Sequence, residues 1–87
     1  MKKTKFIIHG RPVTPREIDF MPFMILGRTI RAIAFEFDLA DSTVKAIMHN
    51  FYLKFDLHNR SDVIAWALKT CWDIDGGFHP ERLDLSN

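Results

Sequence analysis

The sequence predicts one all-α domain built from four short helices. Apolar residues recur at helical spacing, as in Val44, Met48, Phe51 and Phe55, which lie four, three and four residues apart. Residues that favour helix starts stand ahead of the apolar stretches, beginning with Thr14. The chain has 87 residues, of which 47% are apolar and eight are Phe. A chain of this length forms a single domain, and this composition is sufficient for a small helical core.

The first predicted helix runs from Pro15 to about Leu26. Thr14 suits the N-cap position, and Glu17 completes a capping box, in which each residue accepts a hydrogen bond from the backbone of the other. Pro22 lies inside this range and lacks a backbone N–H group. We therefore expect a kink at Pro22, or a division of the helix into two turns.

The next two helices are joined by a short turn. Thr29 is expected to cap a helix over residues 30–37, and the turn of residues 38–40 leads to a helix over residues 41–55. Two helices joined in this way form the helix-turn-helix layout, in which the second helix presents polar side chains to the major groove of DNA. Spacing alone is weak support, because many small helical bundles share it.

The last helix and the two chain ends complete the predicted organisation. Ser61 is expected to cap a helix over residues 62–72. Residues 1–12 are expected to form an arm, residues 13–72 the domain, and residues 73–87 an acidic tail. Within the arm, the apolar run after the first lysines either forms a short strand or packs on the domain.

Charge and composition narrow the class of protein. The net charge of +1 argues against sequence-independent binding to phosphates, which requires a clear basic excess. The distribution of charge predicts a basic body and an acidic tail. The single cysteine, Cys71, fits a reducing compartment. No stretch is long and apolar enough for a signal peptide or a membrane helix, so we expect a cytoplasmic, nucleoid-associated protein that binds no membrane.

The sequence contains no pattern typical of catalysis or of metal binding. The four histidines are scattered, without Cys or carboxylate partners at metal-ligand spacing. A Gly-rich phosphate loop, a nucleophile elbow and a paired-carboxylate arrangement are all missing from the sequence. We therefore expect a protein that is not an enzyme and that carries neither a metal nor a cofactor.

A set of motifs spread over two-thirds of the chain occurs together in one family. The motifs are Thr14-Pro15-Arg16-Glu17, Gly27, Thr29, Ile33-Ala34, Thr43-Val44-Lys45, Lys54-Phe55, Leu57 and Asn59-Arg60. At this spacing the sequence resembles the helix-turn-helix DNA-binding domain of the LuxR/GerE family of bacterial transcription regulators. The resemblance implies that the third helix reads DNA, that the second braces it, and that the fourth makes a two-fold dimer contact. Since only the arm of residues 1–12 precedes the predicted domain, we expect a stand-alone domain without a receiver or ligand-binding domain.

The resemblance also implies which residues contact DNA and which form the dimer. Lys45, Ala46 and His49 would face the bases. Lys45 can donate to guanine O6 and N7, Ala46 can contact a thymine methyl group, and His49 can donate to a base acceptor or a phosphate. The implied phosphate contacts, which would set the position of the protein on DNA, are Thr29, Arg31, Thr43 and Lys54. The implied dimer interface consists of Val63, Trp66, Ala67 and Thr70.

Some residues depart from the family pattern. Ala40 stands where the family has a hydroxyl N-cap, so we expect Asp41 or Ser42 to cap a later helix start. Asp56 replaces a glycine at a position where a left-handed backbone costs an ordinary residue more than glycine. Polar family residues near DNA are replaced here by Ala32 and Ile47, which predicts weaker DNA affinity on a retained fold.

Two functions stay open at this point. The first is a sequence-specific transcription regulator that binds double-stranded DNA as a dimer, with the helix over residues 41–55 in the major groove. The second is an interaction module that pairs with another LuxR-type regulator or transcription factor, as a co-activator or an anti-activator. The expected partners are therefore double-stranded DNA and either a second copy of the chain or a related regulator.

Overall fold

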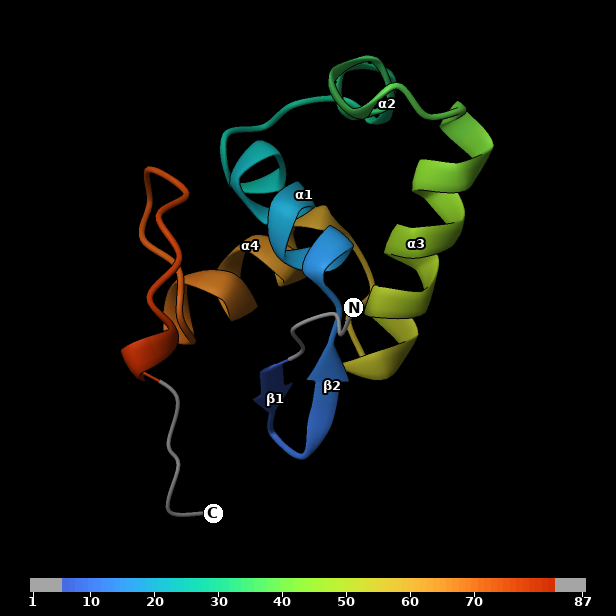
Figure 1. The fold of residues 1–87 in the computed structure, drawn as a ribbon. Helices are drawn as coiled ribbons and strands as arrows, with labels where there is room; N and C mark the ends of the chain where they lie inside the picture. Colours follow the sequence, from blue (N-terminus) through green and yellow to red (C-terminus); the bar gives the residue numbers. More distant parts are fainter. Residues whose placement is uncertain (1–5, 83–87) are drawn as a thin grey trace, which may run out of the picture.

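Four helices form the body of the computed structural model, which describes residues 6–82 (Figure 1). They are α1 (Pro15–Ile25), α2 (Ile30–Phe37), α3 (Asp41–Lys54) and α4 (Arg60–Lys69). Helix α1 packs against both α3 and α4, while α2 packs against α3. Figure 1 shows α3 along one edge of the molecule, with no other helix on its outer side.

A short β-hairpin precedes the helices, so the predicted all-α class is only approximate. Strand β1 (Phe6–Ile8) pairs with β2 (Arg11–Val13) in antiparallel fashion. The turn residues His9 and Gly10 both have positive φ, 51° and 77°, as a two-residue type I′ hairpin turn requires. The arm therefore forms the strand that was one of its two predicted states. Each strand also contributes a fully buried side chain to the core, namely Ile8 and Val13.

The predicted starts of α1 and α2 are confirmed. The Thr14 hydroxyl accepts from the Glu17 N–H at 3.2 Å, and Glu17 Oε1 accepts from the Thr14 N–H at 2.9 Å. The Thr29 hydroxyl accepts from the Ala32 N–H at 3.0 Å. Helix α1 continues through Pro22 as one element, so the division into two turns is wrong. A proline removes a single hydrogen bond from the helix, and buried side chains on both sides of Pro22 hold the helix against the core.

Helix α3 begins at the first residue of its predicted range, 41–55, but its cap differs from the predicted one. Its N-cap is Ala40, which makes no side-chain hydrogen bond, and the helix starts at Asp41. The predicted cap at Asp41 or Ser42 is therefore wrong. The carboxylate of Asp41 lies in the first turn, where it interacts favourably with the helix dipole and offsets part of the missing cap. At the other end, Asp56 has φ 55°, so the left-handed conformation expected at this position is present.

Helix α4 also differs from its predicted bounds. Its N-cap is Asn59, whose Oδ1 accepts from the Asp62 N–H at 2.9 Å, and not Ser61. The helix ends at Lys69, before the predicted end at Trp72. Trp72 leaves the helix because it forms an antiparallel bridge with Phe78.

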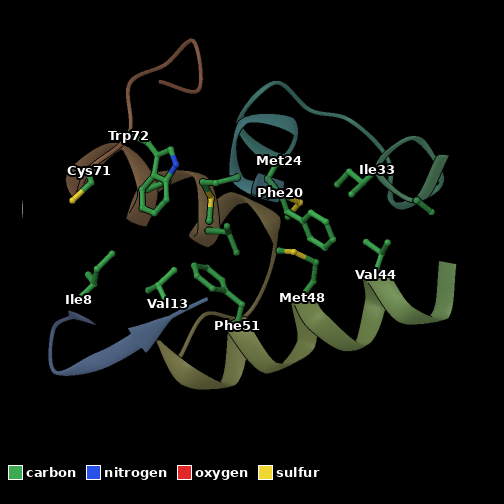
Figure 2. Close-up of a cluster of buried hydrophobic side chains, with 14 residues drawn as sticks. Ile8, Val13, Phe20, Met24, Ile33, Val44, Met48, Phe51, Cys71 and Trp72 are labelled. Atoms are coloured by element: carbon green, nitrogen blue, oxygen red, sulfur yellow. The ribbon is translucent and has the colours of Figure 1, made fainter. Parts of the chain in front are cut away.

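One hydrophobic core joins the hairpin, the helices and the segment after α4 (Figure 2). Its buried residues are Ile8, Val13, Phe20, Met21, Met24, Ile33, Ala34, Val44, Met48, Phe51, Val63, Ala67, Cys71 and Trp72. Burial raises the pKa of the Cys71 thiol, and this desolvation outweighs the opposing effect of the Arg82 charge. The core therefore continues past the helices to Cys71 and Trp72, and Phe78 packs against it.

Residues 73–82, expected as part of a tail, pack against the helical body. The Phe78 ring lies 4.7 Å from the Trp72 ring and 5.3 Å from that of Phe6, measured between centroids. Asp73 accepts from Arg82 at 2.9 Å and lies 2.5 Å from His79 Nε2. The described part of the segment ends in a short 3-10 helix, Pro80–Arg82. The rest of the predicted tail, residues 83–87, lies outside the described residues.

Candidate nucleic-acid interface

The outer face of α3 carries the polar side chains of this helix. Its inner face is formed by the buried residues Val44, Met48 and Phe51. Its exposed residues are Asp41, Ser42, Thr43, Lys45, Ala46, His49, Asn50 and Leu53. At about 1.5 Å per residue, a helix of 14 residues is about 20 Å long. Such a helix fits lengthwise into the major groove of DNA, which is about 12 Å wide.

The three residues implied to face the bases lie together on this outer face. Lys45 and His49 are one helical turn apart, and Ala46 lies beside Lys45 toward the middle of the face. All three side chains are exposed. A surface approaching α3 from outside would therefore meet these three residues among the exposed side chains of this face, with the core behind them.

Three of the four implied phosphate contacts lie at the starts of α2 and α3. Thr29 is the exposed N-cap of α2, and Thr43 is exposed in the first turn of α3. Arg31 is also exposed, with Nε 3.8 Å from Asp41 Oδ2. This ion pair is weak because both partners face water. The Arg31 guanidinium consequently keeps most of its capacity to bind another anion, although the Asp41 carboxylate lies close by.

The fourth, Lys54, has a different role. Its Nζ donates to Glu17 Oε1 at 2.8 Å, to Glu17 Oε2 at 3.0 Å and to the Pro12 carbonyl oxygen at 2.7 Å. An ammonium group has three N–H donors, so these contacts occupy it fully. The side chain of Lys54 is 18% exposed and that of Glu17 is 4% exposed. Lys54 thus connects α3 to α1 and to the hairpin, in place of the phosphate contact that the resemblance implied.

The residues implied for the dimer interface face their own chain. Val63 and Ala67 are fully buried against the core and offer no surface to a second chain. Trp66 is half-buried, with its ring centroid 4.5 Å from that of Phe55. The hydroxyl of Thr70 donates to the Trp66 carbonyl oxygen at 2.6 Å. The spacing of Val63 and Ala67 could have revealed this, because two apolar residues four positions apart lie on one face of a helix.

The solvent-facing side of α4 carries small and apolar residues together with one serine and one lysine. Its exposed residues are Ser61, Ala65, Leu68 and Lys69, with Ile64 half-buried beside them. Leu68 is 39% exposed. This surface, which we call the α4 outer face, lies opposite the side that packs on α1.

Asn50 and Leu53 also lie on the outer face of α3, and the sequence reasoning did not single them out. Asn50 follows Ala46 by four residues, so the two lie one above the other along the helix. That spacing was a usable signal in the sequence. Leu53 is 67% exposed near the end of the helix.

Within residues 6–82 we find no helix of the length and apolar character needed to cross a membrane. The same part of the chain contains no group of three or more His, Cys, Asp or Glu side chains arranged to hold a metal ion.

Comparison with known proteins identifies the family. No curated protein and no solved structure matches the chain. The family model GerE, described as bacterial regulatory proteins of the luxR family, matches residues 11–67. The matched region runs from β2 into α4 and contains the whole outer face of α3. It covers well over half of the chain, and the chain therefore belongs to the luxR family of bacterial regulatory proteins, whose helix-turn-helix domain binds DNA.

Proposed function

We propose that the protein is a sequence-specific transcription regulator that binds DNA as a dimer, with α3 in the major groove. The observation that carries this proposal is the outer face of α3. It presents Lys45, Ala46 and His49 to solvent on one side of a helix whose other side is anchored in the core. A rigidly held helix with exposed polar residues is the arrangement by which helix-turn-helix proteins read base edges.

Each residue on this face has a distinct chemical capacity. Lys45 donates to O6 and N7 of guanine, and the Ala46 methyl group contacts the methyl group of thymine. His49 donates to a base acceptor or to a phosphate oxygen. A good contact to a base is worth about 1–3 kcal/mol of discrimination against the wrong base.

The starts of α2 and α3 support the position of the protein on the DNA backbone. Helix N-termini carry partial positive charge and free N–H groups, which favour phosphate. Thr29, Thr43 and Arg31 lie at these ends and are exposed. The Asp41 carboxylate, 3.8 Å from Arg31, opposes phosphate binding there. Since the net charge of the chain is only +1, we expect modest affinity with a weak salt dependence.

The α4 outer face supports the dimer. Its small and apolar residues allow two copies of α4 to approach closely around a two-fold axis. We therefore assign the contact to Ser61, Ile64, Ala65 and Leu68. In such a dimer the two α3 helices would read half-sites separated by about 34 Å, one turn of DNA.

The test is an unbiased selection of DNA sites with the purified protein, together with its mass in solution. We expect a palindromic site, and we expect Lys45→Ala to lose the preference at one base pair of each half-site, a cost of about 1–3 kcal/mol. Arg11→Ala is a matched control, because it removes one positive charge from the exposed hairpin and not from α3. The absence of any sequence preference at low salt would contradict the proposal.

The exposed apolar face of α4 and the near-neutral charge also favour a second candidate function. In it, the chain pairs through α4 with a related regulator and either supplements or blocks its DNA binding. Co-purification with a related regulator as a one-to-one complex is the expected result. A stable homodimer that binds its site tightly on its own would count against this function.

A further inference from the structure

We propose that Asn50 is a specificity-determining residue that reads an adenine in the major groove. The inference rests on the proposed function, and it adds a base contact beyond those of Lys45, Ala46 and His49. It follows from the position of Asn50 on α3 and from the chemistry of its side chain.

Asn50 lies where a base-reading residue must lie. It is exposed on the outer face of α3, one helical turn beyond Ala46. The buried residues next to it in sequence, Met48 and Phe51, anchor the helix in the core, so the backbone of Asn50 is held firmly. The fold makes a different use of Asn59, whose side chain caps α4. Asn50 is exposed, which leaves its amide available to another molecule.

The carboxamide group matches the edge of adenine. Its oxygen can accept from the N6 amino group while its nitrogen donates to N7, a bidentate pair that separates adenine from the other bases. Lys45 carries only donors, and Ala46 carries no polar side-chain atom. Asn50 is therefore the outer-face side chain with a donor and an acceptor side by side on one planar group.

The spacing along α3 predicts where the adenine lies. Four residues of helix correspond to about 6 Å, and successive bases are about 3.4 Å apart along one strand. The adenine should therefore lie one or two base pairs from the base that Ala46 contacts. The preference of each half-site would then include two neighbouring positions, one set by Ala46 and one by Asn50.

Site selection with the parent protein and with Asn50→Ala tests this inference. The parent should select adenine at one position of each half-site, and Asn50→Ala should accept all four bases there while it keeps the other preferences. Replacing that adenine with 7-deazaadenine, which lacks the N7 acceptor, should weaken binding of the parent about tenfold and leave Asn50→Ala unaffected. Asp19→Asn, on the exposed side of α1, is the control and should select the parent site.

The possible outcomes separate the inference from the proposed function. If the parent selects a defined site and Asn50→Ala selects the same site, the role of Asn50 is overturned while the regulator function stands. If the parent selects no site at all, the proposed function and this inference fail together. Equal weakening of the parent and Asn50→Ala by 7-deazaadenine would also overturn the inference, because another residue would then contact N7.

Discussion

Lys54 Nζ lies 2.8 Å from Glu17 Oε1 and joins the last turn of α3 to the first turn of α1. The same carboxylate oxygen accepts from the backbone N–H of Thr14, and Lys54 also donates to the carbonyl oxygen of Pro12 in β2. The buried Glu17 carboxylate thus connects the cap of α1 to Lys54, and Lys54 connects α3, the helix proposed to read DNA, to the hairpin. This connection sets the direction of α3 relative to the body.

Lys54→Met should lower the free energy of unfolding by about 3 kcal/mol, because it leaves the Glu17 carboxylate buried without a cation. We place the effect at the low end of the range for buried pairs, since the Lys54 side chain is 18% exposed. Urea denaturation followed by circular dichroism measures the change.

The double variant Glu17→Gln, Lys54→Met should recover most of that loss, because no uncompensated charge is left in the core. Lys45→Met, on the outer face of the same helix, is the control and should change stability by less than about 0.5 kcal/mol. A loss for Lys54→Met no larger than that of the control would show that the pair does not hold α3 in place.

The sequence predicts the local features of this fold better than its long-range contacts. The caps at Thr14 and Thr29 act within three residues of themselves, so their hydrogen bonds could be predicted from neighbouring residues. The outer face of α3 follows from helical spacing for the same reason. The sequence predicts Ser61 as the cap of α4, whereas the structure has Asn59 there. Both residue types are good caps, and local preference cannot choose between them.

The contacts that the sequence did not predict join residues far apart in the chain. The resemblance implied a phosphate contact for Lys54, and the partner that it contacts, Glu17, lies 37 residues away in the chain. The end of α4 depends on the pairing of Trp72 with Phe78, a contact that helix preference does not describe. The face of α4 that is available to a partner depends on which side packs against α1. The resemblance implied a dimer contact through Val63 and Ala67, which lie on the buried side. Tertiary packing therefore changes which residues are available for the proposed DNA contact and for the proposed dimer contact.

Leu68→Glu should convert the proposed dimer to a monomer, because it places a charge in the middle of the α4 outer face. Like charges would meet across a two-fold axis, and the carboxylates would lose water. Light scattering after size-exclusion chromatography measures the mass. Lys69→Glu, which adds a carboxylate at the edge of the same face, is the control and should weaken the dimer less. A monomeric parent protein, or a Leu68→Glu variant with the parent mass, would contradict this assignment.

Gly76 and Gly27 form a matched pair for testing how the segment after α4 rests on α1. Both have positive φ, 87° and 80°. A Cβ atom at Gly76 would lie 2.7 Å from Pro22 Cβ and 2.8 Å from Pro22 Cα, whereas one at Gly27 would meet nothing within 4 Å.

Gly27→Ala should therefore cost only backbone strain, about 1–2 kcal/mol. Gly76→Ala should cost this strain and a further 1–3 kcal/mol, roughly, from overpacking against Pro22. Urea denaturation of the two variants gives the difference directly. Equal losses would mean that residues 73–82 do not pack on α1 at Pro22.

Acid should weaken the contacts of residues 73–82. Hydrogen bonds from Arg82, and secondarily from His79, hold the pKa of the Asp73 carboxyl below its ordinary value of 3.8. Because the pKa is lower in the folded chain than in the unfolded chain, the ionised Asp73 stabilises the fold above about pH 4. This contribution is lost as the pH falls through the lowered value. The Glu81 pKa is also lowered, first by a hydrogen bond from its own backbone N–H.

The stability difference between the parent and Asp73→Asn should therefore be present at about pH 6 and shrink as the pH falls below about 4. Urea denaturation at a series of pH values measures it. Asp19→Asn, which alters an exposed carboxylate on α1, corrects for the general effect of acid on the fold. If the difference between the parent and Asp73→Asn did not shrink in acid, the hydrogen bonds from Arg82 and His79 would not be what stabilises the ionised Asp73.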